Sequence, residues 1–200
     1  MPASAALNNF TASLNGARVL LAFEGASSAP SSDQRFTDSV VLSASIAYGV
    51  GCWEGYLESV VREFVAKVRV QSHRRAWTLI TQYEVLVDIK AKELNTPNWE
   101  RARDFVLELI GVDVYSSWIW APKFSSQQDT KAFFDGVMHM RHAFSHGFPA
   151  PASVPGLSTS GKLDGAYASA AIDCLEFFAS TTDRLLEHEL KHRHGCVSGW

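Results

Sequence analysis

The sequence predicts an all-α protein, an elongated helical bundle of about five to six helices with two long antiparallel helices. Over long stretches, apolar residues recur at three- and four-residue steps, the spacing of one helix face. Turn-forming residues gather in residues 27–33, 95–98 and 148–161. Strand signals are weak, because no Asn-Gly or Asp-Gly pair flanks a β-branched run.

The first half of the chain predicts two helices separated by the break at residues 27–33. The first covers residues 5–25. The second runs from about residue 36 to beyond residue 70. It carries one long apolar stripe, made of Val50, Trp53, Leu57, Val61, Phe64 and Val68. These positions predict that the second helix buries one face along most of its length.

The second half predicts four further helices. A third spans residues 74–94, and a fourth spans residues 99–110, with Asn98 as N-cap and Gly111 as its stop. Residues 112–124 are aromatic and rich in serine, which favours an irregular packed connection. A fifth helix begins near Gln127 or Asp129 and ends at Gly147. Three prolines in residues 148–161 forbid a regular helix, and a sixth helix follows over residues 162–191.

Composition favours one globular domain over residues 1–200, with an N-terminal helix and loop in residues 1–35 and a loose tail in residues 192–200. The chain is 46% hydrophobic and 20% charged, enough for a sizeable core. Its net charge of −3, with no long run of Lys or Arg, argues against an extensive nucleic-acid-coating surface. Contact with a few phosphates at one local site stays open.

The location that the sequence indicates is cytoplasmic. Three widely spaced cysteines are poor material for disulfides or a thiolate zinc site, so we expect reduced thiols. The start of the chain lacks a signal peptide pattern. The longest uncharged run is shorter than the roughly 20 residues that cross a bilayer. We therefore expect a soluble protein with no membrane contact and no cofactor.

The predicted fifth helix concentrates histidines at its end. Of seven histidines in the chain, three lie within residues 139–146. A helical projection puts Phe133, Val137, Met140 and Phe144 on one core stripe. His142 falls roughly opposite that stripe, His139 and His146 lie near His142, and Arg141 lies at the border. Asp135 also falls on the polar side.

These residue types suit RNA cleavage without a metal. Histidine can act as base on the 2′-hydroxyl and as acid on the leaving 5′-oxygen, because its pKa lies near neutrality. Arginine can stabilise the charged phosphorane. One alternative is a solvated polar face. A metal site built from Asp135, His139, His142 and His146 is not expected, because these four would span about 16 Å along the helix.

Two segments resemble the HEPN superfamily. Arg141-His142-Ala143-Phe144-Ser145-His146-Gly147 resembles its signature, an arginine, a polar residue and a later histidine at a helix end, often followed by glycine. In that family asparagine is the commonest residue after the arginine. Histidine is a known alternative, and this chain has His142 at that position. The stretch Gly51-Cys52-Trp53-Glu54-Gly55-Tyr56-Leu57 resembles the bacterial RiboL-PSP-like branch. Residues 98–118, a short helix followed by a Leu-Ile-Gly-Val turn, also resemble that branch. The resemblance therefore covers roughly residues 36–190.

The resemblance implies a metal-independent endoribonuclease. His146 is then the general acid/base, Arg141 stabilises the phosphorane and His142 assists. HEPN nucleases usually form homodimers in which both chains contribute to one composite cleft. Members act on RNA in toxin–antitoxin, abortive-infection or antiviral defence systems, so an antitoxin or regulatory partner is expected. Other members are non-catalytic modules that bind RNA, a nucleotide or a partner protein, which is the alternative for this chain.

Other polar and aromatic residues carry two interpretations each. Glu54 is a candidate for orienting Arg141 or His146, or else a surface carboxylate. Ser145 is a candidate RNA contact, although a bond to its own backbone is favoured. His188, His192 and His194 are expected to form a solvated tail rather than a metal site. Packing is favoured over base stacking for the neighbouring aromatic residues, which are Trp118, Trp120 and Phe124.

Overall fold

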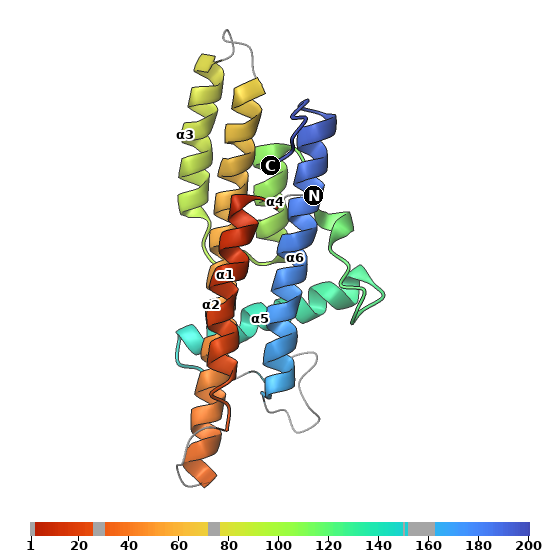
Figure 1. The fold of residues 1–200 in the computed structure, drawn as a ribbon. Helices are drawn as coiled ribbons and strands as arrows, with labels where there is room; N and C mark the ends of the chain where they lie inside the picture. Colours follow the sequence, from red (N-terminus) through yellow and green to blue (C-terminus); the bar gives the residue numbers. More distant parts are fainter. Residues whose placement is uncertain (1–2, 26–30, 72–76, 150, 152–162) are drawn as a thin grey trace. The chain divides into compact units, whose positions relative to one another are not determined.

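The structure is a computed structural model that describes residues 3–25, 31–71, 77–149, 151 and 163–200. Within these ranges it contains six α-helices, a short 3₁₀ turn and no strand, so the predicted all-α class is confirmed (Figure 1). None of the described helices has the length and hydropathy that a membrane span requires. In chain order the elements are α1 (Ala5–Leu21), α2 (Ser31–Gln71), α3 (Trp77–Glu93), α4 (Trp99–Ile110), η2 (Tyr115–Ser117), α5 (Gln127–Ser145) and α6 (Gly165–His192).

The element boundaries agree best with the sequence where caps are local. Helix α4 begins and ends as predicted: Asn98 Oδ1 accepts a hydrogen bond from Arg101 N, and Gly111 takes φ 75°. Helix α1 ends at Leu21, before the expected residue 25. Helix α2 begins earlier than expected, with Asp33 in its first turn, where a carboxylate stabilises the positive end of the helix. Parts of the predicted breaks, residues 26–30, 150 and 152–162, and the predicted start of α3 at residues 74–76 lie outside the described residues.

The chain divides into two compact units. Unit 1 comprises residues 1–10, 54–118 and 178–200, and unit 2 comprises residues 11–53 and 119–177. Helices α1, α2 and α6 each contribute residues to both units, whereas α3 and α4 belong to unit 1 and α5 belongs to unit 2. The prediction of one domain over residues 1–200 stays a prediction.

An aromatic cluster forms the centre of unit 1. The rings of Trp99 and Trp118 meet edge to face at 5.2 Å, and Trp118 stacks on Phe178 at 5.4 Å. Trp118 Nε1 donates a hydrogen bond of 2.9 Å to Thr182 Oγ1. The ring of Trp118 is fully buried, so its polar edge needs this partner. Trp118 therefore has the packing role that the sequence favoured.

The two longest helices run in the same direction within unit 1. Tyr56 of α2 donates to Ala179 O of α6, and Phe64, farther along α2, contacts His194, just beyond α6. The expected antiparallel arrangement is therefore wrong for this pair, because the two contacts advance in the same direction along both helices. Helix α3 is the antiparallel neighbour of α2. Its ion pairs with α2 join Arg62 to Asp88 and Arg69 to Glu84, each at 2.8 Å.

Part of the expected loose tail at residues 192–200 packs against the rest of unit 1. Cys196 is buried, and Trp200 Nε1 donates to Asp183 O at 3.3 Å. The ring of His194 stands edge-on to Phe64 at 5.5 Å. The apolar side chains of Cys196 and Trp200 supply the contact surface that the sequence interpretation overlooked. His188 and His192 are exposed on α6, with ring centroids 4.2 Å apart.

Aromatic rings also fix α5 within unit 2. Phe133 of α5 lies 5.5 Å from Trp120 and 5.3 Å from Tyr167 of α6. Thr130, one turn earlier, accepts a hydrogen bond from Trp120 N at 3.1 Å. These contacts hold one face of α5 against its own unit and leave the other face outward.

Candidate functional site

The candidate site lies at the C-terminal end of α5, which a Schellman motif terminates. Phe148 N donates to Ala143 O at 2.8 Å, and Gly147 N donates to Phe144 O at 3.2 Å. Gly147 takes φ 67°, the left-handed conformation that this motif requires and that glycine adopts without strain. His146 is the C-cap residue. The predicted glycine stop is thus present, and it fixes the backbone of His146 at the helix end.

The buried face of α5 is the one that the projection predicted, except in its last turn. Phe133 and Val137 are fully buried, and Met140 is 1% exposed. Phe144 was expected on the same stripe, but it is 38% exposed, so that expectation is wrong. Ala143 occupies the buried position of the last turn instead, at 6% exposure. Periodicity reports the direction of a side chain, whereas burial also needs a neighbouring element at that level.

The histidines of α5 lie on its outward face. His139, His142 and His146 are all exposed, and Arg141 is half-buried. The ring centroids of His142 and His146 lie 4.4 Å apart, with the planes inclined at 51°. His146 N donates to His142 O at 3.2 Å, which adds a backbone link between the same two residues. The structure therefore brings two imidazoles together, and Arg141 directly precedes one of them, His142, in the sequence.

The charges around this cluster leave Arg141 available. Asp135 lies about two helical turns before Arg141, and its carboxylate forms an ion pair of 2.6 Å with Lys131. Among the described residues, no carboxylate forms an ion pair with Arg141. An arginine without an internal anionic partner can donate its N–H groups to a phosphate. The described residues contain no group of three or more His, Cys, Asp or Glu side chains that could hold a metal ion.

Ser145 forms the backbone bond that the sequence favoured over an RNA contact. Its hydroxyl donates to Arg141 O at 2.9 Å, one helical turn back. This bond is a common local use of serine inside helices. Ser145 is nonetheless exposed, and a contact to RNA stays a prediction.

Glu54 lies on α2 in unit 1 and is half-buried. Its carboxylate accepts a hydrogen bond of 3.3 Å from Thr96 N, in the connection between α3 and α4. Its neighbours Trp53 and Tyr56 are buried. The structure thus gives Glu54 a local structural contact, and its predicted support of Arg141 or His146 stays a prediction.

The sequence interpretation missed Phe148. Its side chain is 61% exposed, and its ring lies 6.0 Å from that of His146 with an angle of 28° between the planes. The signal was present in the pattern, because the residue after a left-handed helix-terminating glycine is commonly apolar. Phe148 therefore adds an aromatic surface beside the two histidines.

Comparison with known proteins gives no relative for this chain. No protein-family model matches it, and neither a curated protein nor a solved structure matches it. The HEPN resemblance therefore stays a prediction from two segments, Arg141 to Gly147 and Gly51 to Leu57.

Proposed function

We propose that this chain is a metal-independent endoribonuclease of the HEPN type, with its site at the C-terminal end of α5. The observation that carries the proposal is the cluster itself. His142 and His146 are exposed, with ring centroids 4.4 Å apart, and the half-buried Arg141 is the residue before His142 in the sequence. Histidine pairs of this kind can supply both a base and an acid near neutral pH.

The proposed reaction is a transesterification within RNA. A histidine base takes the proton of a 2′-hydroxyl, the 2′-oxygen attacks the neighbouring phosphorus, and the bond from phosphorus to the 5′-oxygen breaks. A protonated histidine gives its proton to that 5′-oxygen. The products are a 2′,3′-cyclic phosphate and a 5′-hydroxyl. Arg141 donates hydrogen bonds to the non-bridging oxygens as charge builds on the phosphorane. His146 is the principal acid/base, and His142 assists.

The proposed active form is a homodimer with a composite cleft. The exposure of His142 and His146 supports it, because a second α5 can approach a face that its own chain leaves open. Two clusters together double the available proton-transfer groups and cations. A mixture of inactive Arg141→Ala and His146→Ala chains is then expected to regain part of the activity. A fully active monomer in sedimentation analysis would contradict the composite cleft.

The direct test is cleavage of single-stranded RNA by purified protein in EDTA. Arg141→Ala and His146→Ala are expected to lower the rate by about 10²–10⁴-fold, the usual contribution of a positioned acid or base. His139→Ala is the matched control, because His139 is exposed on the same helix but lies outside the motif. Equal cleavage by the wild type and by both site variants would show that a contaminant is responsible and that the proposal is wrong.

The proposed biological role is defence through RNA damage, restrained by an antitoxin or regulatory partner. Induced expression of the wild-type chain in a bacterial host is then expected to stop growth, and His146→Ala is expected to relieve the arrest. Growth arrest that persists in His146→Ala would separate toxicity from the proposed chemistry.

The second candidate is a non-catalytic HEPN module that binds RNA, a nucleotide or a partner protein. The net charge of −3 favours it, because a weakly acidic protein attracts little RNA beyond a local site. Binding of RNA without any product would support this candidate.

A further inference from the structure

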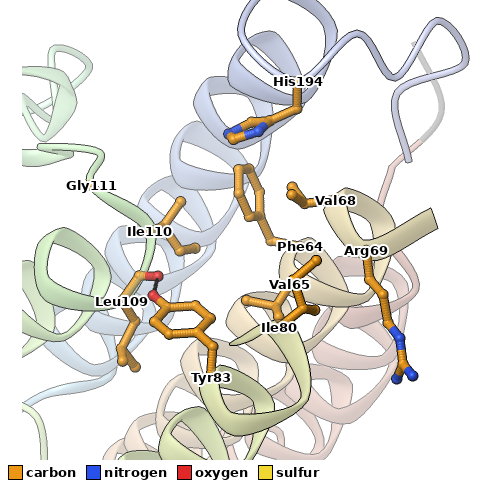
Figure 2. A pocket seen from close by; sticks show the side chains of 10 residues that line it. All are labelled: Phe64, Val65, Val68, Arg69, Ile80, Tyr83, Leu109, Ile110, Gly111 and His194. Carbon is orange, nitrogen blue, oxygen red and sulfur yellow. Dashed lines mark hydrogen bonds between the residues drawn. The ribbon is translucent and has the colours of Figure 1, made fainter. Parts of the chain in front are cut away.

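Unit 1 contains a cavity whose lining includes neither His142 nor His146. Its volume is about 310 Å³, and its walls come from α2, α3, the end of α4 and the chain beyond α6 (Figure 2). Apolar and aromatic side chains make up most of the lining, among them Phe64, Val68, Ile80, Tyr83 and Ile110. All of these residues belong to unit 1. A concave apolar space of this size is typical of small-molecule sites.

Contacts among the lining residues hold the walls in place. The hydroxyl of Tyr83 donates to Leu109 O, which ties α3 to the end of α4 (Figure 2). The ring of His194 stands edge-on to Phe64 at 89°, and His194 N donates to Glu189 O at 3.3 Å. A ligand that enters preformed walls loses little binding free energy to ordering the protein.

The charges at the cavity favour a neutral ligand. Arg69 is the permanently charged residue of the lining, and Glu84 already neutralises it through an ion pair of 2.8 Å. In Figure 2 the guanidinium of Arg69 points away from Phe64 and Tyr83. The C-terminal end of α4, at Ile110 and Gly111, brings the partial negative charge of a helix terminus to the wall. An anionic head group would gain little from Arg69 and would be repelled by that terminus.

His194 supplies the polar contact. Its imidazole is half-buried and lines the cavity, and its ring nitrogens have no hydrogen-bond partner among the described residues. Because a neutral imidazole offers one donor and one acceptor, it can bond to a single hydroxyl or N–H of a ligand. The other uncharged polar side chain of the wall, Tyr83, already uses its hydroxyl proton on Leu109 O.

The size and the aromatic lining define the ligand class. A cavity of about 150 Å³ holds benzene, so twice that volume has room for a fused bicyclic ring system. Phe64, Tyr83 and His194 offer ring edges and faces to a planar molecule. We propose that this cavity binds a neutral bicyclic aromatic molecule that carries one hydroxyl or N–H group, which hydrogen-bonds to His194. This site does not depend on the proposed nuclease activity.

The test is calorimetric titration of the full chain with 2-naphthol, naphthalene and octanoate. 2-Naphthol is expected to bind about fivefold more tightly than naphthalene, the gain of one net hydrogen bond. In His194→Phe the two affinities are expected to become equal, because the aromatic edge is kept and the bonding group is lost. Octanoate is expected to bind more weakly than 2-naphthol.

The second part of the test fills the cavity with larger side chains. Ile80→Trp and the smaller change Val68→Phe place bulk in the cavity, and each is expected to abolish 2-naphthol binding. Val85→Trp is the matched control on α3, because Val85 is 56% exposed and does not line the cavity. Circular dichroism confirms which variants are folded. Absence of 2-naphthol binding to the wild type, unchanged binding in folded Val68→Phe, or tighter binding of octanoate would each overturn the proposal.

Discussion

Polar groups lie in different environments in the aromatic cluster of unit 1 and at the end of α5 in unit 2. In unit 1, the polar atoms of two buried rings bond inside the protein: Trp118 Nε1 donates to Thr182 Oγ1 and the Tyr56 hydroxyl donates to Ala179 O, both at 2.9 Å. At the end of α5, the imidazoles of His142 and His146 are exposed instead. Among the described residues, their side chains make a ring contact with each other and no hydrogen bond.

This difference separates residues that hold the fold from residues that are available for chemistry. A buried polar group must be satisfied within the protein, since an unsatisfied one destabilises the folded state by about 1–3 kcal/mol. An exposed group has no such requirement, so its side chain adds little to stability. Variants in unit 1 are therefore expected to change the free energy of unfolding, whereas variants at the end of α5 are expected to change RNA cleavage.

The largest expected effect is at the centre of unit 1. Trp118→Ala is expected to lower the free energy of unfolding by about 3–5 kcal/mol, because it removes a fully buried ring and leaves a cavity. Urea denaturation followed by circular dichroism measures the change. Trp118→Phe is the control that keeps most of the ring volume and should lose clearly less. An unchanged urea midpoint in Trp118→Ala would mean that the cluster does not hold the unit.

A buried carboxyl in unit 1 is expected to make stability depend on pH. Burial raises the pKa of Asp183, and Glu63 and Glu187 add to the rise, although two hydrogen bonds from Ser4 lower it. Because the folded state then holds the proton more tightly, this contribution to stability is fully present below the unfolded pKa of about 3.9. It is lost as the pH rises through the higher folded-state pKa.

Urea midpoints measured across this range test the sign. The wild type is expected to lose more stability than Asp183→Asn as the pH rises above about 4, because asparagine cannot titrate. Identical pH profiles in the two proteins would show that Asp183 titrates alike in the folded and unfolded states.

A smaller effect is expected at the start of α4. Asn98→Ala is expected to lower the free energy of unfolding by about 1 kcal/mol, because it removes the side-chain bond to Arg101 N. Asn98→Asp keeps an acceptor at this position and should retain most of the stability. If alanine and aspartate were equally destabilising, the cap would not be the cause.

The smallest expected change in stability is at the end of α5. His142→Ala and His146→Ala should alter the free energy of unfolding by no more than about 0.5 kcal/mol, as is usual for exposed positions. Thermal unfolding provides the measurement. A loss comparable to that of Trp118→Ala would place these histidines among the residues that hold the fold and would remove the separation between the two regions.

Local signals in the sequence were sufficient for several features. The ends of α4 follow from Asn98 and Gly111, because caps act within one turn. The outward direction of His142 and His146 follows from helical spacing alone. The Gly147 stop likewise depends on a single residue that tolerates a positive φ.

Features that depend on distant partners could not be predicted in the same way. The common direction of α2 and α6 depends on contacts such as that of Tyr56 with Ala179, which are 123 positions apart in the sequence. The exposure of Phe144 and the burial of Cys196 depend on which element lies opposite each side chain. The 4.4 Å contact between His142 and His146 depends on rotamers, which helical spacing leaves open.

Analysis of the reaction products tests whether the exposed cluster at the end of α5 cleaves RNA as proposed. A 5′-labelled single-stranded RNA is incubated with the wild type and with His146→Ala in EDTA, and the products are identified by mass spectrometry. We predict 2′,3′-cyclic phosphate ends from the wild type, loss of cleavage in His146→Ala, and no cutting at a linkage whose 2′-hydroxyl is replaced by hydrogen. Cleavage that persists in His146→Ala, or that proceeds at the 2′-deoxy linkage, would contradict that proposal.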